Sequence, residues 1–309
     1  MPKITHDVAW QDALDEFLLL KQSEGRAERT VHDYRYHVGK FLEKYEDAWP
    51  HYPKLKKAVL EFFAAMQGMS ATTFNLYRQY LKAFFAWCVE EGYLPKNPID
   101  GIKKRKNDGK PRSVEMETIE KLLKSINTKT YAGLRDYCLI LFQLDTGIRP
   151  GEALQLLPEH FNLKAFEAVI PDTVAKTRTA RTVIFSPQTG KAIQKLLAVR
   201  PKDWTDDVPV FASENGTRMS VGTWGNRLSM YHPKIGYKVT PYMLRHTSAI
   251  MFLRGGGHVF ALQRQLGHAS LVMTKRYVHL ADSDLHEQHA IASPVGQLMP
   301  QRTRIRKVR

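Results

Sequence analysis

Apolar residues recur every three or four positions through most of the first hundred residues. Four segments share this pattern: residues 7–23, a segment opened by Thr30 and Asp33, residues 54–66, and a segment that starts at Ser70 and stops before Gly92. The spacing places the apolar side chains on one face of a helix, and Thr30 with Asp33 has the spacing of a helix N-cap pair. We therefore expect residues 1–100 to form a small four-helix domain.

The pattern changes in the second part of the chain. Residues 117–126 and 134–144 are again helical in pattern, but 166–170 and 181–185 are short runs of strand-forming residues on either side of a turn. Helical spacing then resumes in four further segments: 189–199, 224–230, 244–253 and 259–266. Residues 113–290 are therefore expected to form a mostly helical domain with a small antiparallel β-sheet. The predicted fold class is mainly α.

Basic residues gather in the stretch between these two domains and on the helix before it. Asn97-Pro98 breaks the helical pattern, and residues 101–112 are polar and basic, as in a linker. Candidate contacts to a DNA backbone are Arg78, Lys82, Lys103, Lys104, Arg105 and Lys106. A core helix with a solvated face, followed by a merely solvated linker, is the alternative. Residues 291–309 form a basic C-terminal tail, and its last part, residues 301–309, is expected to be disordered when free.

Charge narrows the possible partners. The chain has 46 lysine and arginine residues against 31 aspartate and glutamate residues, a formal net charge of +15. Such an excess favours a polyanion, either nucleic acid or an acidic membrane surface. No stretch reaches the roughly 20 apolar residues of a membrane span, and the N-terminus lacks the apolar segment of a signal peptide. We expect a cytoplasmic nucleic-acid-binding protein with no membrane partner.

Cys88 and Cys138 lie in apolar helical patterns and are expected to be buried thiols, without a disulfide or zinc.

Two arginines have the chemistry that metal-free phosphodiester cleavage requires. A phosphate gains negative charge at its reacting oxygens in the transition state, and a fixed guanidinium group can neutralise it. Arg149 and Arg245 both lie at ends of apolar helical segments, where a rigid helix would hold them. The alternative is an ordinary salt bridge, for example to Glu152.

A nucleophile and a general acid are also present. Tyr277 follows Lys275 and Arg276 and stands nine residues after His268, and nearby cations favour the phenolate. Lys176 lies in the turn between the two strand-like runs and is a candidate to protonate the leaving 5′ oxygen. A core tyrosine and a solvent-exposed turn lysine are the alternatives.

These candidate residues lie in short sequence motifs, and the order of the motifs along the chain is informative. They are Gly92–Pro98 before the basic linker, Thr146–Glu152 (Thr-Gly-x-Arg-x-x-Glu), Lys176–Val183, Leu244–Thr247 (Leu-Arg-His-Thr) and Leu266–Tyr277 (Leu-Gly-His, then tyrosine). In this order they resemble the tyrosine recombinases, the phage-integrase and Xer family, over almost the whole chain. The resemblance implies a SAM-like core-binding domain over residues 1–100 and a catalytic domain over residues 113–290.

The resemblance also implies a role for each residue. Arg149 and Arg245 would clamp the scissile phosphate, and His268 would bond a non-bridging oxygen. Lys176 would protonate the leaving oxygen. Tyr277 would attack and form a 3′-phosphotyrosyl bond, so that neither a cofactor nor a metal is expected.

Two further positions belong to the implied site. Glu152 would orient the side chains of Arg149 and Arg245 without contacting the phosphate itself. Tyr242 stands three residues before Arg245, where the family usually has histidine. A tyrosine can donate a hydrogen bond to a phosphate oxygen, but it cannot shuttle a proton near neutral pH.

The implied partners are double-stranded DNA with inverted-repeat core sites and further copies of the chain in a tetramer on two sites. Accessory DNA-bending or directionality proteins would be additional partners. Residues 282–309 would dock onto a neighbouring copy, with a frayed tail as the alternative, and an extra N-terminal arm-binding domain is not expected. The reaction would be integration and excision of a mobile element or resolution of DNA. A DNA-binding protein without catalysis and a type IB topoisomerase remain alternatives, and the helical N-terminal half favours a recombinase.

Overall fold

The computed structural model describes residues 8–106, 112–281, 289 and 293–298. The chain divides into two compact units, residues 1–109 and 110–309, and each is described by itself. The division falls inside the predicted linker. Helices dominate both units, and the only sheet of the described residues lies in the second, which confirms the mainly α fold class.

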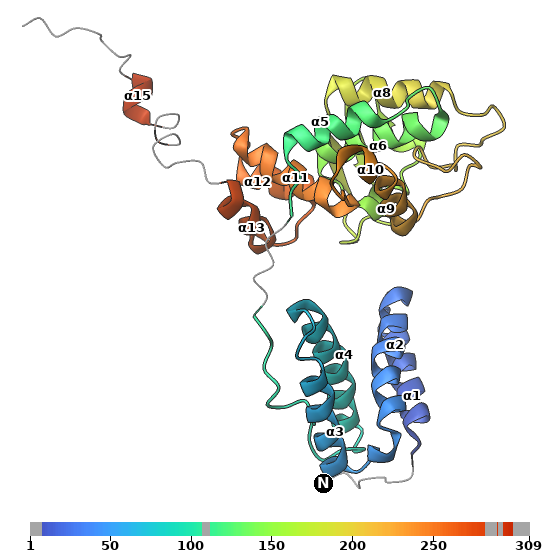
Figure 1. The fold of residues 1–309 in the computed structure, drawn as a ribbon, viewed down its shortest axis with the longest axis vertical. Helices are drawn as coiled ribbons and strands as arrows, with labels where there is room; N and C mark the ends of the chain where they lie inside the picture. Colours follow the sequence, from blue (N-terminus) through green and yellow to red (C-terminus); the bar gives the residue numbers. More distant parts are fainter. Residues whose placement is uncertain (1–7, 107–111, 282–288, 290–292, 299–309) are drawn as a thin grey trace, which may run out of the picture. The chain divides into compact units, whose positions relative to one another are not determined.

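Four helices and a short 3₁₀ turn form the first unit (Figure 1). They are α1 (Trp10–Ser23), α2 (Glu28–Lys44), η1 (Glu46–Ala48), α3 (Tyr52–Ala65) and α4 (Ala71–Glu90). Fully buried phenylalanines from three of the helices, Phe17, Phe41 and Phe84, fill the core, and Phe17 meets Phe84 edge to face. The predicted four-helix domain is confirmed.

The predicted start of the second helix is wrong. The helix begins at Glu28, with Ala27 as an N-cap that makes no side-chain bond. Thr30 therefore lies inside the first turn, and Asp33 pairs with Arg29 at 3.0 Å across one turn of the helix. Asp33 makes this i, i+4 ion pair and no capping contact, because the helix begins three residues before the position that Thr30 as N-cap predicts.

The first part of the predicted linker is packed against the helices. Arg105 donates through Nη1 to the carbonyls of Met66 and Met69, at 3.0 and 3.2 Å, and its guanidinium lies 3.9 Å from the ring centre of Phe74. The side-chain amide of Asn75 donates through Nδ2 to the carbonyl of Arg105, and its Oδ1 accepts from the backbone N–H of Arg105. Arg105 therefore holds the chain to the loop between α3 and α4 and to α4 itself. The predicted linker, residues 101–112, is thus not a free segment in this first part.

The other predicted DNA contacts of this unit remain near its surface. Arg78 donates to the carbonyl of Ile102 at 2.5 Å, and Lys82 lies 3.7 Å from Asp100. Lys103 and Lys104 are exposed. Arg78, like Arg105, therefore binds the start of the linker to the helices. Lys82, Lys103 and Lys104 are exposed and accessible to a polyanion.

The second unit is a set of helices around a small sheet. In chain order it contains α5 (Met116–Ser125), α6 (Tyr131–Thr146), α7 (Pro150–Ala153), η2 (Pro158–His160), β1 (Phe161–Asn162), β2 (Glu167–Ile170), β3 (Arg181–Ile184), α8 (Pro187–Ala198), α9 (Val221–Ser229), α10 (His232–Ile235), α11 (Pro241–Arg254), α12 (Val259–Leu266), α13 (Leu271–Ala281) and α15 (Pro294–Leu298). The sheet is antiparallel in the order β1-β2-β3, with Ala168 opposite Val183. The predicted small antiparallel sheet is confirmed, and the two-residue β1 adds a strand beside the two predicted runs.

The core of the second unit is built on α6. Phe142 is fully buried and packs against Phe161, Phe185 and Phe211. The buried indole of Trp224 donates to Gln143 on the same helix at 2.7 Å. Helix α11 packs against α6, and α13 packs against α11 (Figure 1). This stack holds the ends of α6, α11 and α12 in fixed positions.

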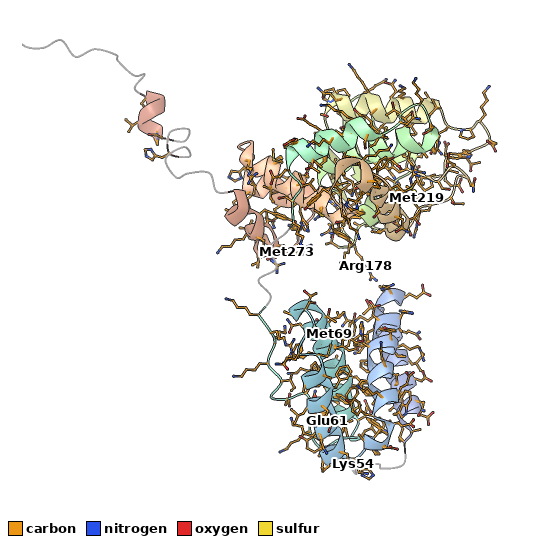
Figure 2. All side chains as sticks on the ribbon, in the orientation of Figure 1. Lys54, Glu61, Met69, Arg178, Met219 and Met273 are labelled. Atoms are coloured by element: carbon orange, nitrogen blue, oxygen red, sulfur yellow. The ribbon has the colours of Figure 1, made fainter. Side chains whose placement is uncertain are left out.

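Both cysteines are free and buried, one in each unit, as predicted. Burial raises the pKa of the Cys138 thiol to about 12 and also raises that of Cys88. Over the described ranges, no helix is both long and apolar enough to cross a membrane, and no three His, Cys, Asp or Glu side chains are grouped as metal ligands would be. Figure 2 shows the side chains of both units on this ribbon.

Candidate active site

Arg149 is held where α6 ends and α7 begins. Gly147 ends α6 in the left-handed conformation at φ 60°, and Arg149 is the N-cap residue of α7, followed by Pro150. Its guanidinium donates to Glu152 Oε1 and to the carbonyl of Gly267, both at 3.1 Å. The Thr-Gly-x-Arg segment therefore turns the chain sharply and leaves Arg149 facing α12, more than a hundred residues away in sequence.

Arg245 is fixed by the ends of two helices. Only 4% of this α11 residue is exposed. It donates to the carbonyl of Gly147 at 2.5 Å and to that of Leu266 at 3.0 Å, at the C-terminal ends of α6 and α12. Helix C-termini carry partial negative charge and suit a cation. Burial and the nearby charge of Arg149 nevertheless lower the pKa of Arg245 to about 10, so an anion bound here would be stabilised strongly.

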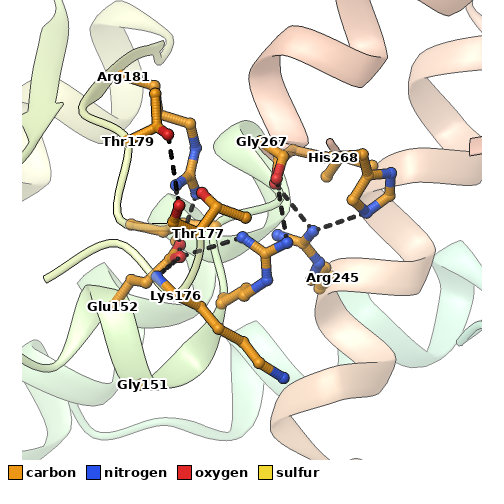
Figure 3. A network of polar contacts seen from close by, with 12 residues as sticks. Gly151, Glu152, Lys176, Thr177, Thr179, Arg181, Arg245, Gly267 and His268 are labelled. Atoms are coloured by element: carbon orange, nitrogen blue, oxygen red, sulfur yellow. Dashed lines mark hydrogen bonds and ion pairs between the residues drawn. The ribbon is translucent and has the colours of Figure 1, made fainter. Parts of the chain in front are cut away.

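Glu152 connects two guanidinium groups, as Figure 3 shows. Its side chain is 3% exposed; Oε1 accepts from Arg149, and Oε2 accepts from Arg181 of β3 at 2.5 Å. The backbone N–H of Lys176 also donates to Oε1, at 3.1 Å. Burial opposes ionisation of Glu152, but the bonds and charge of Arg181 outweigh it and lower the pKa of the carboxyl. The predicted role of Glu152 toward Arg149 has a direct contact to support it, whereas its second partner is Arg181 and not Arg245.

Arg181 is a site residue that the sequence did not single out. It is almost fully buried, and its Nε has no hydrogen-bond partner in the structure. The signal was weak: a basic residue stands at the start of a strand-like run, next to a turn rich in Thr, Lys and Arg. Arg181 and Arg149 share the Glu152 carboxylate, and Arg245 adds a third guanidinium group nearby. The excess positive charge suits a phosphate.

His268 touches Arg245 on one side and Thr274 on the other. The Nε2 atom lies 3.0 Å from Arg245 Nη2, and Nδ1 lies 2.9 Å from Thr274 Oγ1. Burial and the charges of three arginines lower the pKa of His268 to about 4, so the ring is neutral at neutral pH. An arginine only donates, so Nε2 accepts and Nδ1 donates to the Thr274 hydroxyl. To bond a phosphate oxygen the ring must exchange its tautomer, and a hydroxyl partner permits that exchange.

Tyr277 is buried beside His268. It is 4% exposed, and its ring is nearly parallel to that of His268, with the ring centres 6.3 Å apart. Its hydroxyl lies 2.8 Å from Nδ1 of His246. Burial raises the pKa of the Tyr277 phenol, although Arg245, Arg276 and Arg149 oppose this. The expectation that neighbouring cations favour the phenolate is therefore wrong on balance, because desolvation outweighs the charges.

Lys176 and Tyr242 differ from the rest of the predicted site. Lys176 is anchored through its backbone to Glu152, but its side chain is exposed and extends away from that carboxylate (Figure 3). Tyr242, on the first turn of α11, is 51% exposed. The structure thus brings together Arg149, Glu152, Arg245 and His268, with Tyr277 against His268. A cavity of about 710 Å³ opens beside them, lined by Arg181, His268 and residues of the hairpin and α12.

Gly267 permits the close approach of these groups. It has φ 62°, and a Cβ there would lie 2.7 Å from Nε of Arg181. Replacing Gly267 by alanine is expected to displace Arg181 and the carbonyl that holds Arg149, and to slow any cleavage about 10- to 100-fold with DNA affinity retained. Gly236→Ala is the matched control, since Gly236 has φ 69° with nothing within 4 Å of its added Cβ. Equal losses in both variants, measured in a single-turnover assay, would show that backbone strain alone is responsible.

Comparison with known sequences adds independent information. The sequence model of the phage integrase family matches residues 112–284. The tyrosine recombinase XerA of Pyrococcus furiosus is 32% identical over 286 residues, which cover 89% of this chain and 92% of that protein. The tyrosine recombinase XerC of Yersinia pestis is 26% identical over 272 residues, covering 86% of this chain and 88% of that protein.

Solved structures share the fold. XerH site-specific recombinase bound to its palindromic difH substrate, in a post-cleavage complex, superposes with a TM-score of 0.71 at 22% identity, over 90% of this chain and 83% of that one. A lambda integrase fragment, a dimer bound to a COC′ core site, superposes with a TM-score of 0.72 at 16% identity, over 89% of this chain and 96% of that one.

Proposed function

The chain belongs to the phage integrase family of tyrosine recombinases, site-specific enzymes that break and rejoin DNA, and from this we propose how its residues divide the work. Tyr277 attacks the scissile phosphate and forms a 3′-phosphotyrosyl bond. The observation that carries this assignment is the position of Tyr277: its ring lies against His268, which in turn contacts the buried Arg245. A phosphate that met these guanidinium groups would lie beside the tyrosine.

Arg149 and Arg245 are proposed to hold the non-bridging oxygens of the phosphate. Both are fixed through carbonyls at helix ends, so little reorganisation is needed when the transition state forms. Arg181 and Glu152 keep Arg149 in place. His268 donates to a phosphate oxygen after it exchanges its tautomer against Thr274.

Lys176 is proposed to protonate the leaving 5′ oxygen. Its backbone is tied to Glu152, while its exposed side chain is available to reach into a bound duplex. Tyr242 is proposed to donate a hydrogen bond to a phosphate oxygen, for which its exposed position on α11 leaves room.

The proposed substrate is double-stranded DNA with inverted-repeat core sites. The solved relatives support it, since they are described as bound to a palindromic substrate and to a core site. The exposed Lys82, Lys103 and Lys104 would contact the backbone. A tetramer on two sites, docking of residues 282–309 onto a neighbour, accessory proteins, a cytoplasmic location and a role in a mobile element are part of the same proposal. Most of residues 282–309, like residues 107–111, lie outside the described residues.

Covalent capture tests the proposal. Sites are first selected by binding from a randomised duplex library and are then made with a nick beside the cleavage position, so that the short fragment diffuses away and traps the intermediate. We expect a protein–DNA adduct on a denaturing gel, and peptide mapping should place it on Tyr277. The variant Tyr242→Phe should form the adduct on the same residue, Tyr277, but more slowly, because it lacks the proposed hydrogen-bond donor.

Other outcomes would overturn the proposal in identifiable ways. Binding without an adduct would indicate a DNA-binding protein without catalysis. An adduct mapped to Tyr242 would move the nucleophile to α11. Relaxation of plasmids that lack the selected site would indicate a topoisomerase.

A further inference from the structure

A histidine that the family motifs leave without a role contacts the nucleophile. His246 follows Arg245 on α11 and is half-buried. Its Nδ1 lies 2.8 Å from the hydroxyl oxygen of Tyr277 on α13. We propose that His246 accepts the phenolic proton of Tyr277 during DNA cleavage and returns it when the strand is rejoined. This inference rests on the proposed function of Tyr277.

The reaction needs such an acceptor. A phenol with an ordinary pKa near 10 is protonated at neutral pH, and a protonated oxygen is a poor nucleophile. The charged groups around Tyr277 are Arg245, Arg149 and Arg276, and a guanidinium cation donates hydrogen bonds but offers no lone pair to take this proton. Lys176 is assigned to the leaving oxygen on the other side of the phosphorus. The proton must therefore go to a neutral base.

Of the two histidines next to Tyr277, His246 is the one with a nitrogen directed at the hydroxyl. His268 has Nδ1 on Thr274 and Nε2 on Arg245, so both of its nitrogens are engaged. Tyr242, at the position where the family usually carries a histidine, is exposed and is itself a phenol. Within the described ranges, His246 Nδ1 is the neutral acceptor within hydrogen-bond distance of Tyr277.

The surroundings of His246 keep it in the required form. It is partly buried, and the charged groups that face the His246–Tyr277 pair are Arg245 on the same helix, Arg149 before α7 and Arg276 on α13. Burial and the charge of Arg245 lower the pKa of His246, which favours the neutral ring. With its proton on Nε2, the ring offers the Nδ1 lone pair to the Tyr277 O–H.

The step balances. As the bond from Tyr277 Oη to phosphorus forms, the phenolic proton moves to His246 Nδ1, and the bond from phosphorus to O5′ breaks while O5′ takes a proton from Lys176. In rejoining, neutral Lys176 removes the proton from a 5′ hydroxyl, which attacks the phosphotyrosine. Tyr277 then leaves and recovers its proton from the imidazolium of His246. Both residues end in their starting states.

Substrates with two kinds of leaving group separate the two proton transfers. We compare an ordinary phosphodiester with a 5′-bridging phosphorothiolate, whose thiolate leaves without a proton, in single-turnover adduct formation by the full chain. His246→Ala should be slower by about 10²- to 10³-fold on both substrates. Lys176→Ala should be slow only on the phosphodiester. His232→Asn, at an exposed histidine of α10, is the matched control and should keep the wild-type rate.

A pH profile and a second variant distinguish proton transfer from simple positioning. The deficit of His246→Ala should shrink as the pH rises, because the phenol then ionises without help. His246→Asn places an oxygen near the Nδ1 position that can accept a hydrogen bond but not a proton at these pH values. It should remain at least about 10-fold slow, so it also serves as the test if the alanine variant does not fold.

Three results would overturn the inference. They are a wild-type rate in His246→Ala, a wild-type rate and pH profile in His246→Asn, and restoration of His246→Ala by the phosphorothiolate, which would place His246 on the leaving-group side. Failure of the proposed function looks different: the wild-type chain would form no adduct with either substrate.

Discussion

Replacing Tyr277 by phenylalanine should abolish the covalent adduct and leave the folded protein and its DNA binding in place. The substitution removes one oxygen atom, the one that is proposed to bond to phosphorus. The remaining ring still fills its buried position against His268. The cost to stability should be about 1–2 kcal/mol, because His246 Nδ1 loses its hydrogen-bond partner. Catalysis should fall more than about 10⁴-fold, since no charge stabilisation can replace a missing nucleophile.

Two measurements on the same samples check this result. A native gel with the selected duplex reports binding, and a denaturing gel reports the covalent bond. We expect the Tyr277→Phe variant to shift the duplex on the first and to give no band on the second. His246 and the three arginines are unchanged in this variant, so it also shows whether they bind the phosphate without the hydroxyl. An adduct that persists in Tyr277→Phe would assign the nucleophile elsewhere.

Much of the site could be predicted from the sequence because each motif is local. The Thr-Gly-x-Arg-x-x-Glu segment turns sharply at Gly147 and brings Arg149 and Glu152 together within four positions. Which distant groups then meet could not be read from spacing. The Gly267 carbonyl binds Arg149 from 118 positions away, and only the packing of the helix ends determines this contact.

The residues that the sequence did not predict were missed for one physical reason. Arg181, Thr274 and His246 are polar residues on a strand or a helix, and in a sequence such residues look like a solvated face. They are recognisable only when a partner from another element appears, namely Glu152, His268 and Tyr277 respectively. The direction of the Tyr277 pKa shift could not be predicted for the same reason: its charged neighbours are visible in the sequence, but its burial is a tertiary property.

Replacing Glu152 by glutamine should have the largest effect on stability. The carboxylate is 3% exposed and holds Arg149 and Arg181, whose side chains are nearly buried too. Removing the charge leaves two guanidinium groups without their counter-ion, and breaking a buried pair costs about 3–5 kcal/mol. Cleavage should fall by about 100-fold or more, because Arg149 loses one of its two anchors. Glu120→Gln, at an exposed α5 pair, should cost less than about 1 kcal/mol.

The pH dependence identifies the carboxylate as the source of this stability. The pKa of Glu152 in the folded protein lies below its ordinary value of 4.5. Its contribution to stability is therefore complete above pH 4.5 and is lost as the pH falls through the folded pKa. Hydrogen exchange of α6 and α11 in the full chain measures the local free energy of opening. The gap between wild type and Glu152→Gln should be widest near neutral pH and close in acid, because the wild-type carboxyl then becomes as neutral as the amide. A gap of constant size would mean that the glutamine acts through its shape, and that the charge of Glu152 does not hold the arginines.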